Sequence, residues 1–356
     1  MELFDSRNAL EAFQAGLRAR LEEKGADEEV IRGALASGYY FRTFGDPFSG
    51  RTWVSVSDSM YGNKQFSSSF EPEAFVDYAM GRGKSFSALP DFQTFVIKSR
   101  ADVDLVLSDP RRLSYLKDGS MTFRGQPQQH FIKRELPNPV RSNDRGEELS
   151  VLPGAYRQRG SPYSFDIEPA ESRIAQFLPR HLFRGDANTP FAYDPMRVEQ
   201  HYATQTRGLD LSFDVDVALF FATHRFQILK DGRAFYRRVA TGNHCGVVYA
   251  FRFCEPPVKR ESFLIREFDL FRDHTPERVL RQNCGLPLMD DFERNIATTD
   301  IDCILQLHAD YSSDSMLTAE HLFPAVKEDK FYGALLEQKD KYPDFLASVV
   351  EYAWAR

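Results

Sequence analysis

The stretch EQHYATQTRGLDLSFDVDVALFFA, residues 199–222, decides the expected fold. Its second half predicts a helix over residues 213–226, with Ser212 as the N-cap and with Asp214 and Asp216 in the first turn, where the helix dipole favours negative charge. Behind them, apolar residues recur at helical spacing: Val215, Ala218, Leu219, Ala222 and Phe226. Such a stripe is typical of a helix that buries one face in a core.

The first half of the same stretch is crowded with hydrogen-bonding side chains on a segment that we expect to be extended. These side chains belong to Gln200, His201, Tyr202, Thr204, Gln205, Thr206, Arg207 and Asp210. Buried polar groups must be paired or must serve a ligand, so we expect a site here. The structural alternatives are a hydrogen-bonded core or turn histidine for His201, and for Asp210 a bond to Arg207 or a share in capping the helix.

Composition indicates a soluble globular chain. Its 356 residues, 42% of them hydrophobic, suffice for one large domain or two smaller ones. No run approaches the ~18 apolar residues of a membrane span, and the start, MELFDSRNALEAF, is too acidic and amphipathic for a secretion signal. The four cysteines lie far apart without a CxxC pair, which disfavours zinc knuckles and disulfide frameworks and favours a reducing, cytoplasmic setting.

The formal net charge of −7 argues against a general nucleic-acid binder. Residues 110–184 nevertheless hold 13 Lys or Arg against 8 Asp or Glu. This basic stripe could meet a phosphate-bearing ligand or an RNA, although solvated loop charge is the simpler interpretation.

The rest of the chain predicts short helices and strands, without internal repeats. Helices are expected as a hairpin over residues 7–36, and at residues 73–80, 102–107, 331–338 and 343–354. Strands are expected at residues 51–56, 92–97, 244–253, 263–271 and 302–308. A change of composition near residues 81–90 indicates a soft domain boundary.

A strand-like Met121-Thr122-Phe123 delivers Arg124 and stops at Gly125. A guanidinium at a strand end, beside a glycine that lets a ligand approach the backbone, suits phosphate or carboxylate recognition, with an ordinary salt bridge as the alternative. The FRG triplet recurs at residues 183–185, so Arg184 competes with Arg124 for this role.

Several segments together resemble the FRG domain, a family named for that tripeptide, over about residues 90–330. The resembling segments are Phe123-Arg124-Gly125-Gln126, Leu152-Pro153 with Arg157, Gln200-His201-Tyr202, Thr206-Arg207, Leu209-Asp210, Ala218-Leu219-Phe220-Phe221-Ala222, Arg278 with Gln282 and Gly285, and Leu322-Phe323-Pro324. In the family the FRGQ segment precedes the Leu-Pro segment, which makes Arg124 the better match and Arg184 a chance recurrence.

The FRG domain in turn resembles the core of ADP-ribosyltransferases, which transfer ADP-ribose from NAD. The resemblance implies Arg124, Thr206 and Gln282 as catalytic residues. It also implies an NAD site that uses Arg124, Gln126, His201, Tyr202, Arg207 and Asp210. In this scheme Arg124 binds phosphate or ribose, Thr206 and Arg207 brace the site, and Tyr202 stacks on nicotinamide.

The glutamine at the third motif position raises a question of chemistry. Gln282 cannot act as a general base, because an amide has no basic lone pair comparable to a carboxylate. It either orients the acceptor, or a carboxylate such as Glu267, Glu277 or Glu293 supplies the base, or the protein is not catalytic.

We therefore expect an α+β fold with a mixed or antiparallel β core and flanking helices. The expected organisation is an N-terminal extension (residues 1–88), an FRG domain (89–330) and C-terminal helices packed on it (331–356). The expected function is mono-ADP-ribosyl transfer from NAD to a nucleic acid or protein, as a toxin or phage-defence effector, with an antitoxin or regulatory protein as a possible partner. The alternatives are a non-catalytic nucleotide- or partner-binding module and an NAD-hydrolysing effector. We expect no metal, no membrane association and a cytoplasmic location.

Overall fold

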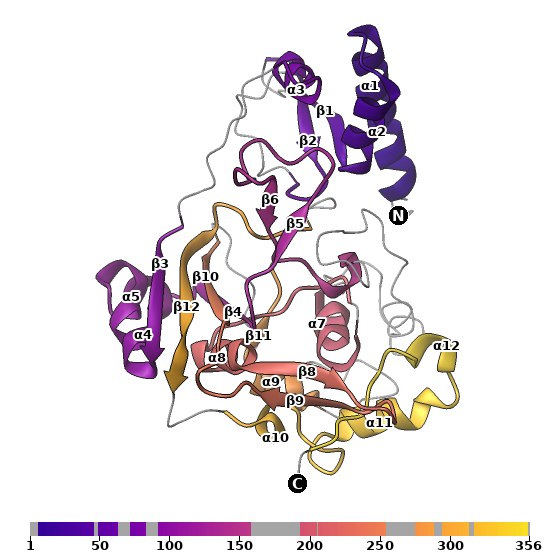
Figure 1. Cartoon of the computed structure of the whole chain (residues 1–356). Coiled ribbons are helices and arrows are strands. Elements are labelled where there is room, and N and C mark those ends of the chain that lie inside the picture. Colours follow the sequence, from indigo (N-terminus) through magenta and orange to yellow (C-terminus); the bar gives the residue numbers. More distant parts are fainter. Residues whose placement is uncertain are drawn as a thin grey trace.

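A six-stranded sheet of order β11-β7-β4-β10-β12-β3 forms the centre of the computed structural model (Figure 1). Its strands are β3 (Thr94–Ser99), β4 (Met121–Gln126), β7 (Leu211–Ser212), β10 (Val247–Arg252), β11 (Cys284–Gly285) and β12 (Ile301–Ser312). Neighbouring strands are antiparallel, except that β12 and β3 are parallel. The fold is therefore α+β with a sheet of mixed orientation, as predicted at that level.

The structure describes residues 6–45, 49–62, 72–82, 92–157, 193–204, 206–253, 275–287, 294–312 and 317–354. The predicted strand at residues 263–271, most of the predicted boundary at 81–90, Gln205 and the second FRG triplet with Arg184 lie outside these ranges. No helix within the described ranges is long and apolar enough to cross a membrane.

Strand β10 separates two cores because its side chains alternate between the faces of the sheet. Val247, Tyr249 and Phe251 pack on one face with Phe253, which follows the strand, and this confirms the alternation read from the sequence. Val248 and Ala250 pack on the other face, against helices α4 (Arg100–Leu107) and α8 (Val215–Thr223). Helix α5 (Pro110–Lys117) follows α4 at the β3 edge (Figure 1).

Helix α8 is shorter than predicted. Its N-cap is Asp214, whose carboxylate accepts from the Asp216 amide, whereas Ser212 lies in β7. Val215, Ala218, Leu219 and Ala222 are buried as the apolar stripe required. Phe226 does not belong to that stripe, because the backbone becomes extended at His224 and enters strand β8 (His224–Ile228), which pairs with β9 (Ala234–Arg238).

The polar segment before α8 also differs from the prediction. Residues 199–202 are not extended but form the last turn of α7 (Tyr193–Tyr202). The segment leaves this helix at Ala203, whose amide still bonds Glu199, and only then runs to β7. Val198 and Tyr202 anchor the helix in the core, whereas the run of polar side chains suggested an extended segment.

The N-terminal elements lie at the end of the molecule away from α8 (Figure 1). The predicted helical hairpin is present as α1 (Ser6–Glu23) and α2 (Glu28–Ala36), followed by β1 (Tyr39–Gly45), β2 (Thr52–Asp58) and α3 (Pro72–Ala79). They bury a core of their own, which includes Leu17, Ile31 and Phe75 and is contacted by Leu136 from beyond β5 (Phe131–Lys133).

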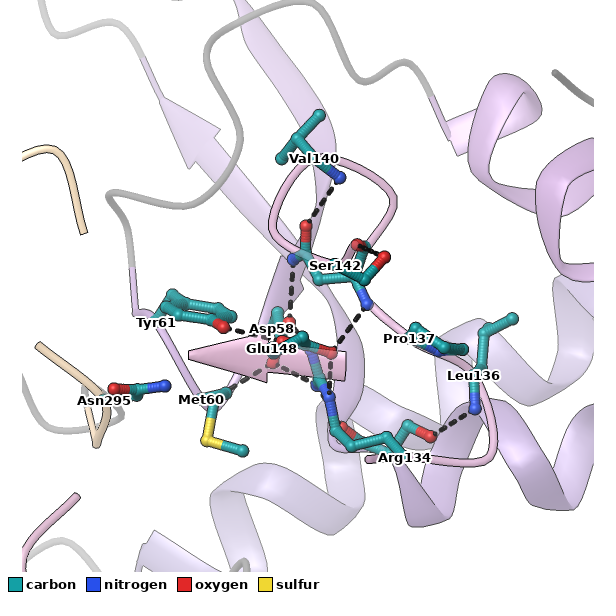
Figure 2. A network of polar contacts seen from close by, with 12 residues as sticks. Asp58, Met60, Tyr61, Arg134, Leu136, Pro137, Val140, Ser142, Glu148 and Asn295 are labelled. Carbon is teal, nitrogen blue, oxygen red and sulfur yellow. Dashed lines mark hydrogen bonds and ion pairs between the residues drawn. The ribbon is translucent and has the colours of Figure 1, made fainter. Parts of the chain in front are cut away.

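A buried ion network joins this N-terminal part to the hairpin of β5 and β6 (Glu147–Leu149) (Figure 2). Arg134 donates to Asp58 Oδ2 at 2.7 Å and to Glu148 Oε2 at 2.8 Å, and Tyr61 donates to Glu148 at 2.6 Å. Desolvation is the main reason that the pKa of Asp58 is raised, while Arg134 counteracts it. The two parts of the chain are therefore coupled through charges that are costly to expose singly.

The C-terminal residues pack beside α7 and the β8–β9 hairpin. Three short helices lie in this region: α9 (Glu277–Arg281), α10 (Ala319–Leu322) and α11 (Lys330–Lys339). A short 3-10 turn, η1 (Gly154–Tyr156), follows β6 earlier in the chain. The prediction of a helix over residues 343–354 is wrong beyond the first turn, because helix α12 (Pro343–Leu346) ends there. The chain then runs alongside β9, where the Ala234 N–H donates to the Glu351 carbonyl and the Ala353 N–H donates to the Ala234 carbonyl.

Candidate functional site

A pocket of about 280 Å³ lies where β4, β7 and α8 meet the end of α7. It collects polar side chains from segments far apart in sequence, namely Arg124, Gln200, His201, Asp210, Ser212 and Gln282. It also has an aromatic wall formed by Phe221, Phe226, Tyr236, Phe323 and Tyr352. A site of this kind, with few placed polar groups beside aromatic surface, is the usual form of a small-molecule pocket.

Arg124 and Asp210 form the charged part of the pocket. Arg124 Nη1 donates to Asp210 Oδ1 at 2.8 Å and to the Asp210 carbonyl at 2.7 Å. Its Nε is buried and makes no hydrogen bond within the described part of the chain. The guanidinium thus bonds Asp210 through one nitrogen, and its other N–H groups can donate to a ligand oxyanion.

The Asp210 carboxylate is held ionised. Desolvation acts to raise its pKa, but Arg124 and the ring of His201 more than offset this, and the net pKa is lowered. Gln200 Nε2 donates to the same Oδ1 at 3.0 Å. A charged carboxylate fixed by two donors is suited to stabilise a developing positive charge.

His201 lines the pocket and is uncharged at neutral pH. Only 5% of the residue is exposed, and burial lowers the pKa of its ring to about 4. Its Nε2 is buried without a hydrogen-bond partner among the described residues. The neutral ring can therefore exchange one hydrogen bond with a ligand.

Gln282 reaches the pocket from the C-cap of α9. Its Nε2 donates to the Leu322 carbonyl at 3.0 Å, and its backbone carbonyl accepts from Ser212 Oγ at 2.8 Å. The side chain is fixed through its amide nitrogen, and it also lies within hydrogen-bonding reach of the His201 ring. Glu277 pairs with Arg281 at 3.5 Å and does not line the pocket, while Glu267 and Glu293 lie outside the described residues.

Thr206 lies behind the pocket wall. Its hydroxyl is directed to Gln200 Oε1, and Gln200 in turn bonds Asp210. Thr206 is 3% exposed and is not among the lining residues. The order Thr206, Gln200, Asp210, Arg124 forms a chain of contacts that sets the orientation of the charged pair.

The remaining predicted ligand residues point elsewhere. Tyr202 OH donates to Asp329 Oδ2 at 2.7 Å, and its ring packs on Phe331 at 5.1 Å, so it does not line the pocket. Gln126 is 4% exposed on β4, and Arg207 lies close enough to Glu199 to act on its pKa; neither lines the pocket.

Arg278, also singled out from the sequence, organises the aromatic wall from behind. Its buried guanidinium lies 3.8 Å from the Tyr332 ring centroid, 4.6 Å from that of Tyr202 and 4.8 Å from that of Tyr352. Nη1 also donates to the His201 carbonyl at 3.2 Å. One cation thus ties α7 to the C-terminal residue that lines the pocket.

The aromatic wall was missed by sequence reasoning. Tyr236 stacks on Phe323 at 4.8 Å, and Phe323 stacks on Tyr352 at 4.8 Å. The Leu322-Phe323-Pro324 segment was noted only as part of the family resemblance, and Tyr352 was expected on a helix. Only the pairing of the C-terminal residues with β9 brings these rings together.

Other chemistries find less support among the described residues. No group of three or more His, Cys, Asp or Glu side chains is arranged there to hold a metal ion. Cys284 lines the pocket, but burial raises the pKa of its thiol, which keeps it protonated and a poor nucleophile. Comparison with family models, curated proteins and solved structures found no match.

Proposed function

We propose that this pocket binds the nicotinamide riboside end of NAD and that the protein transfers ADP-ribose to a macromolecule. The observation that carries the proposal is the presence, in one pocket, of Arg124 paired with Asp210 and of a wall of aromatic rings. A guanidinium suits the pyrophosphate, and aromatic rings suit the nicotinamide or its neighbouring base. At about 280 Å³, the pocket would enclose only part of a dinucleotide.

The Asp210 carboxylate is the charged group suited to the reaction itself. When the bond between nicotinamide and the ribose C1′ breaks, its electron pair leaves with nicotinamide and positive charge develops on the sugar. Asp210 stabilises that charge, and Arg124 holds the phosphate while still bonded to Asp210. An acceptor oxygen or nitrogen then bonds C1′, and its proton passes to the Asp210 carboxylate.

His201 and Gln282 supply orientation in this scheme. The neutral His201 ring and the Gln282 Oε1 offer single hydrogen bonds to ribose hydroxyls or to the acceptor. Thr206 acts on the charged pair through Gln200 and is a positioning residue. Because Asp210 accepts the proton of the acceptor, this scheme needs no glutamate at position 282.

A second candidate is a non-catalytic module that binds a nucleotide. The engagement of Asp210 by both Arg124 and Gln200, together with an amide at position 282, favours it. Ligand recognition would then use the same phosphate and ring contacts without cleavage of the glycosidic bond.

The test is incubation of the purified chain with NAD labelled on the adenylate, in the presence of RNA, DNA or cell-extract protein. Asp210→Asn and Arg124→Ala are compared with Asp104→Asn, which removes an exposed carboxylate on α4. Transfer of label by the wild type and the Asp104 variant only would support the proposal. Nicotinamide release without transfer indicates hydrolysis, and intact NAD with a ligand-induced thermal shift indicates the binding module.

A further inference from the structure

The β8–β9 hairpin carries more exposed apolar surface than its fold requires. Phe226 is 41% exposed, Ile228 51% and Leu229 37%. The hairpin lies along the same end of the molecule as α8, α10 and α11 (Figure 1). Exposed apolar side chains grouped on one element indicate a surface used for contact.

The same hairpin carries a local excess of cations. Residues 224–238 contain five Lys or Arg and one Asp, in a chain with a formal net charge of −7. Asp231 is engaged by Arg233 at 2.7 Å within the turn. The other four cations, Arg225, Lys230, Arg237 and Arg238, are exposed and form no ion pair within the described residues.

Two of these arginines face each other directly. Arg225 on β8 is the register partner of Arg237 on β9. Like charges directly opposite on a sheet are destabilising, so the fold gains nothing from this pair. The arrangement indicates an anionic partner that neutralises both.

The opposite face of the same hairpin borders the proposed NAD pocket and carries a further cation, Arg238, on the same side as Tyr236. Phe226 and Tyr236 are register partners on the opposite side of the hairpin from Arg225 and Arg237, and both line the pocket. Their ring centroids lie 5.5 Å apart. A single strand that passes around the edge of this two-stranded hairpin would meet Arg225 and Arg237 on one face and the reactive end of the dinucleotide on the other.

We propose that the β8–β9 hairpin binds single-stranded RNA and presents it as the acceptor of ADP-ribose. This inference rests on the proposed function and names its acceptor class. Cations that meet phosphates, together with aromatic and apolar side chains that meet unpaired bases, form the usual surface for single strands. RNA is chosen over DNA because unpaired bases are the form in which proteins ordinarily read RNA.

The test measures binding of a fluorescent single-stranded RNA of about 20 nucleotides by anisotropy, without NAD, between about 50 and 200 mM salt. The double variant Arg225→Gln, Arg237→Gln should bind about tenfold more weakly. The slope of log affinity against log salt should flatten by about 0.7 for each phosphate that the variant no longer neutralises. The control Arg51→Gln, Arg82→Gln removes two exposed arginines from the N-terminal part of the chain, outside the basic stripe of residues 110–184, and should bind as the wild type does.

Thermal unfolding of both double variants distinguishes loss of binding from loss of fold. Equal weakening by the control, or tighter binding of a DNA strand of the same sequence, would overturn the assignment to RNA. Preferential binding to vesicles with anionic headgroups would assign the surface to a membrane instead. Because NAD is absent from this assay, RNA binding by a chain that leaves NAD intact supports the surface while refuting the proposed reaction.

Discussion

The backbone of Gly125 lies directly against the carbonyl of Ala218, so that a Cβ on Gly125 would be 1.7 Å from that oxygen. One turn further along α8, a Cβ on Gly246 would be 2.0 Å from the Ala222 carbonyl. Helix α8 therefore rests on the backbone of β4 and on the residue before β10, with no side chain between. The glycine of the FRGQ segment is required by packing, and that packing fixes Arg124 beside the helix.

Gly125→Ala should be severely destabilising. The new methyl group meets backbone rather than a flexible side chain, so helix and sheet must separate, and we expect a loss of about 3 kcal/mol or more in the free energy of unfolding. Urea unfolding followed by circular dichroism measures it. Gly16→Ala is the matched control. Gly16 lies inside α1, and its new Cβ would be at an ordinary contact distance of 3.8 Å from Phe41. Helix propensity therefore predicts a gain of about 1 kcal/mol in the free energy of unfolding. Similar stability of both variants would contradict the close approach.

Two buried groups at the end of α7 give stability a defined pH dependence. Desolvation raises the pKa of Glu199 to about 8, and burial lowers that of His201 to about 4. From pH ~6.5 to 8, unfolded Glu199 has lost its proton while the folded residue retains it. Stability should therefore fall as pH rises, by about 2 kcal/mol over that range.

Below pH ~6.5 the two effects oppose each other. Unfolded His201 gains a proton that the buried ring refuses, which lowers stability as pH falls, while Glu199 acts in the opposite direction down to pH ~4.5. Glu199→Gln should abolish the loss above pH ~6.5 and uncover a decline between pH ~6.5 and ~4, to which His201 contributes about 3 kcal/mol. Glu320→Gln, an exposed carboxylate, should leave the wild-type profile unchanged. If Glu199→Gln instead has the pH–stability profile of the wild type, Glu199 is ionised in the folded state.

The fold was predictable where the pattern along the chain is local. The helical hairpin at the N-terminus, β2, α3, β10 and the stripe of α8 all follow from side-chain periodicity. Periodicity could not reveal that the stripe ends at Ala222, because Phe226 repeats the helical spacing by chance while its backbone pairs with Tyr236. The position of the C-terminal residues was likewise not predictable from local periodicity. Tyr352 is placed by a β-bridge to Ala234, which lies far earlier in the chain.

The polar part of the site was predictable because several of its residues stand in short segments that the sequence singles out. Arg124, His201, Asp210 and Gln282 do line one pocket. The orientation of Tyr202 was not predictable, because it depends on Asp329, which approaches from a distant helix cap. The aromatic wall has no local signal, since aromatic residues are spread throughout this chain.

Phe226→Ala should separate ligand binding from stability. The ring is 41% exposed, so the free energy of unfolding should change by less than about 1 kcal/mol. Loss of one stacking surface should nevertheless weaken NAD binding about tenfold, measured by calorimetry. Leu105→Ala, which truncates an exposed apolar side chain away from the pocket, should change neither quantity. Unaltered NAD affinity in the Phe226 variant would remove the aromatic wall from the ligand site.

Asp58→Asn should weaken the junction between the N-terminal part and the sheet. It leaves the buried Arg134 with Glu148 as its remaining charged partner among those described above, and breaking such a pair costs about 3 kcal/mol. Differential scanning calorimetry should show one transition at a lower temperature. Glu135→Gln, which breaks the exposed pair with Arg32, should cost less than about 1 kcal/mol. Equal costs would indicate that the Asp58 pair is solvated.

Thr206→Val tests whether the chain of contacts behind the pocket positions the reacting groups. Valine keeps the shape of threonine but cannot donate to Gln200, so Gln200 is free to turn and its bond to Asp210 is broken. Because Thr206 does not itself line the pocket, KM for NAD should change little while kcat falls about tenfold. Thr206→Ser retains the hydroxyl and should recover most of kcat, which a loss of packing alone would not allow. A Thr206→Val enzyme with wild-type kcat would show that Arg124 alone is sufficient to orient Asp210.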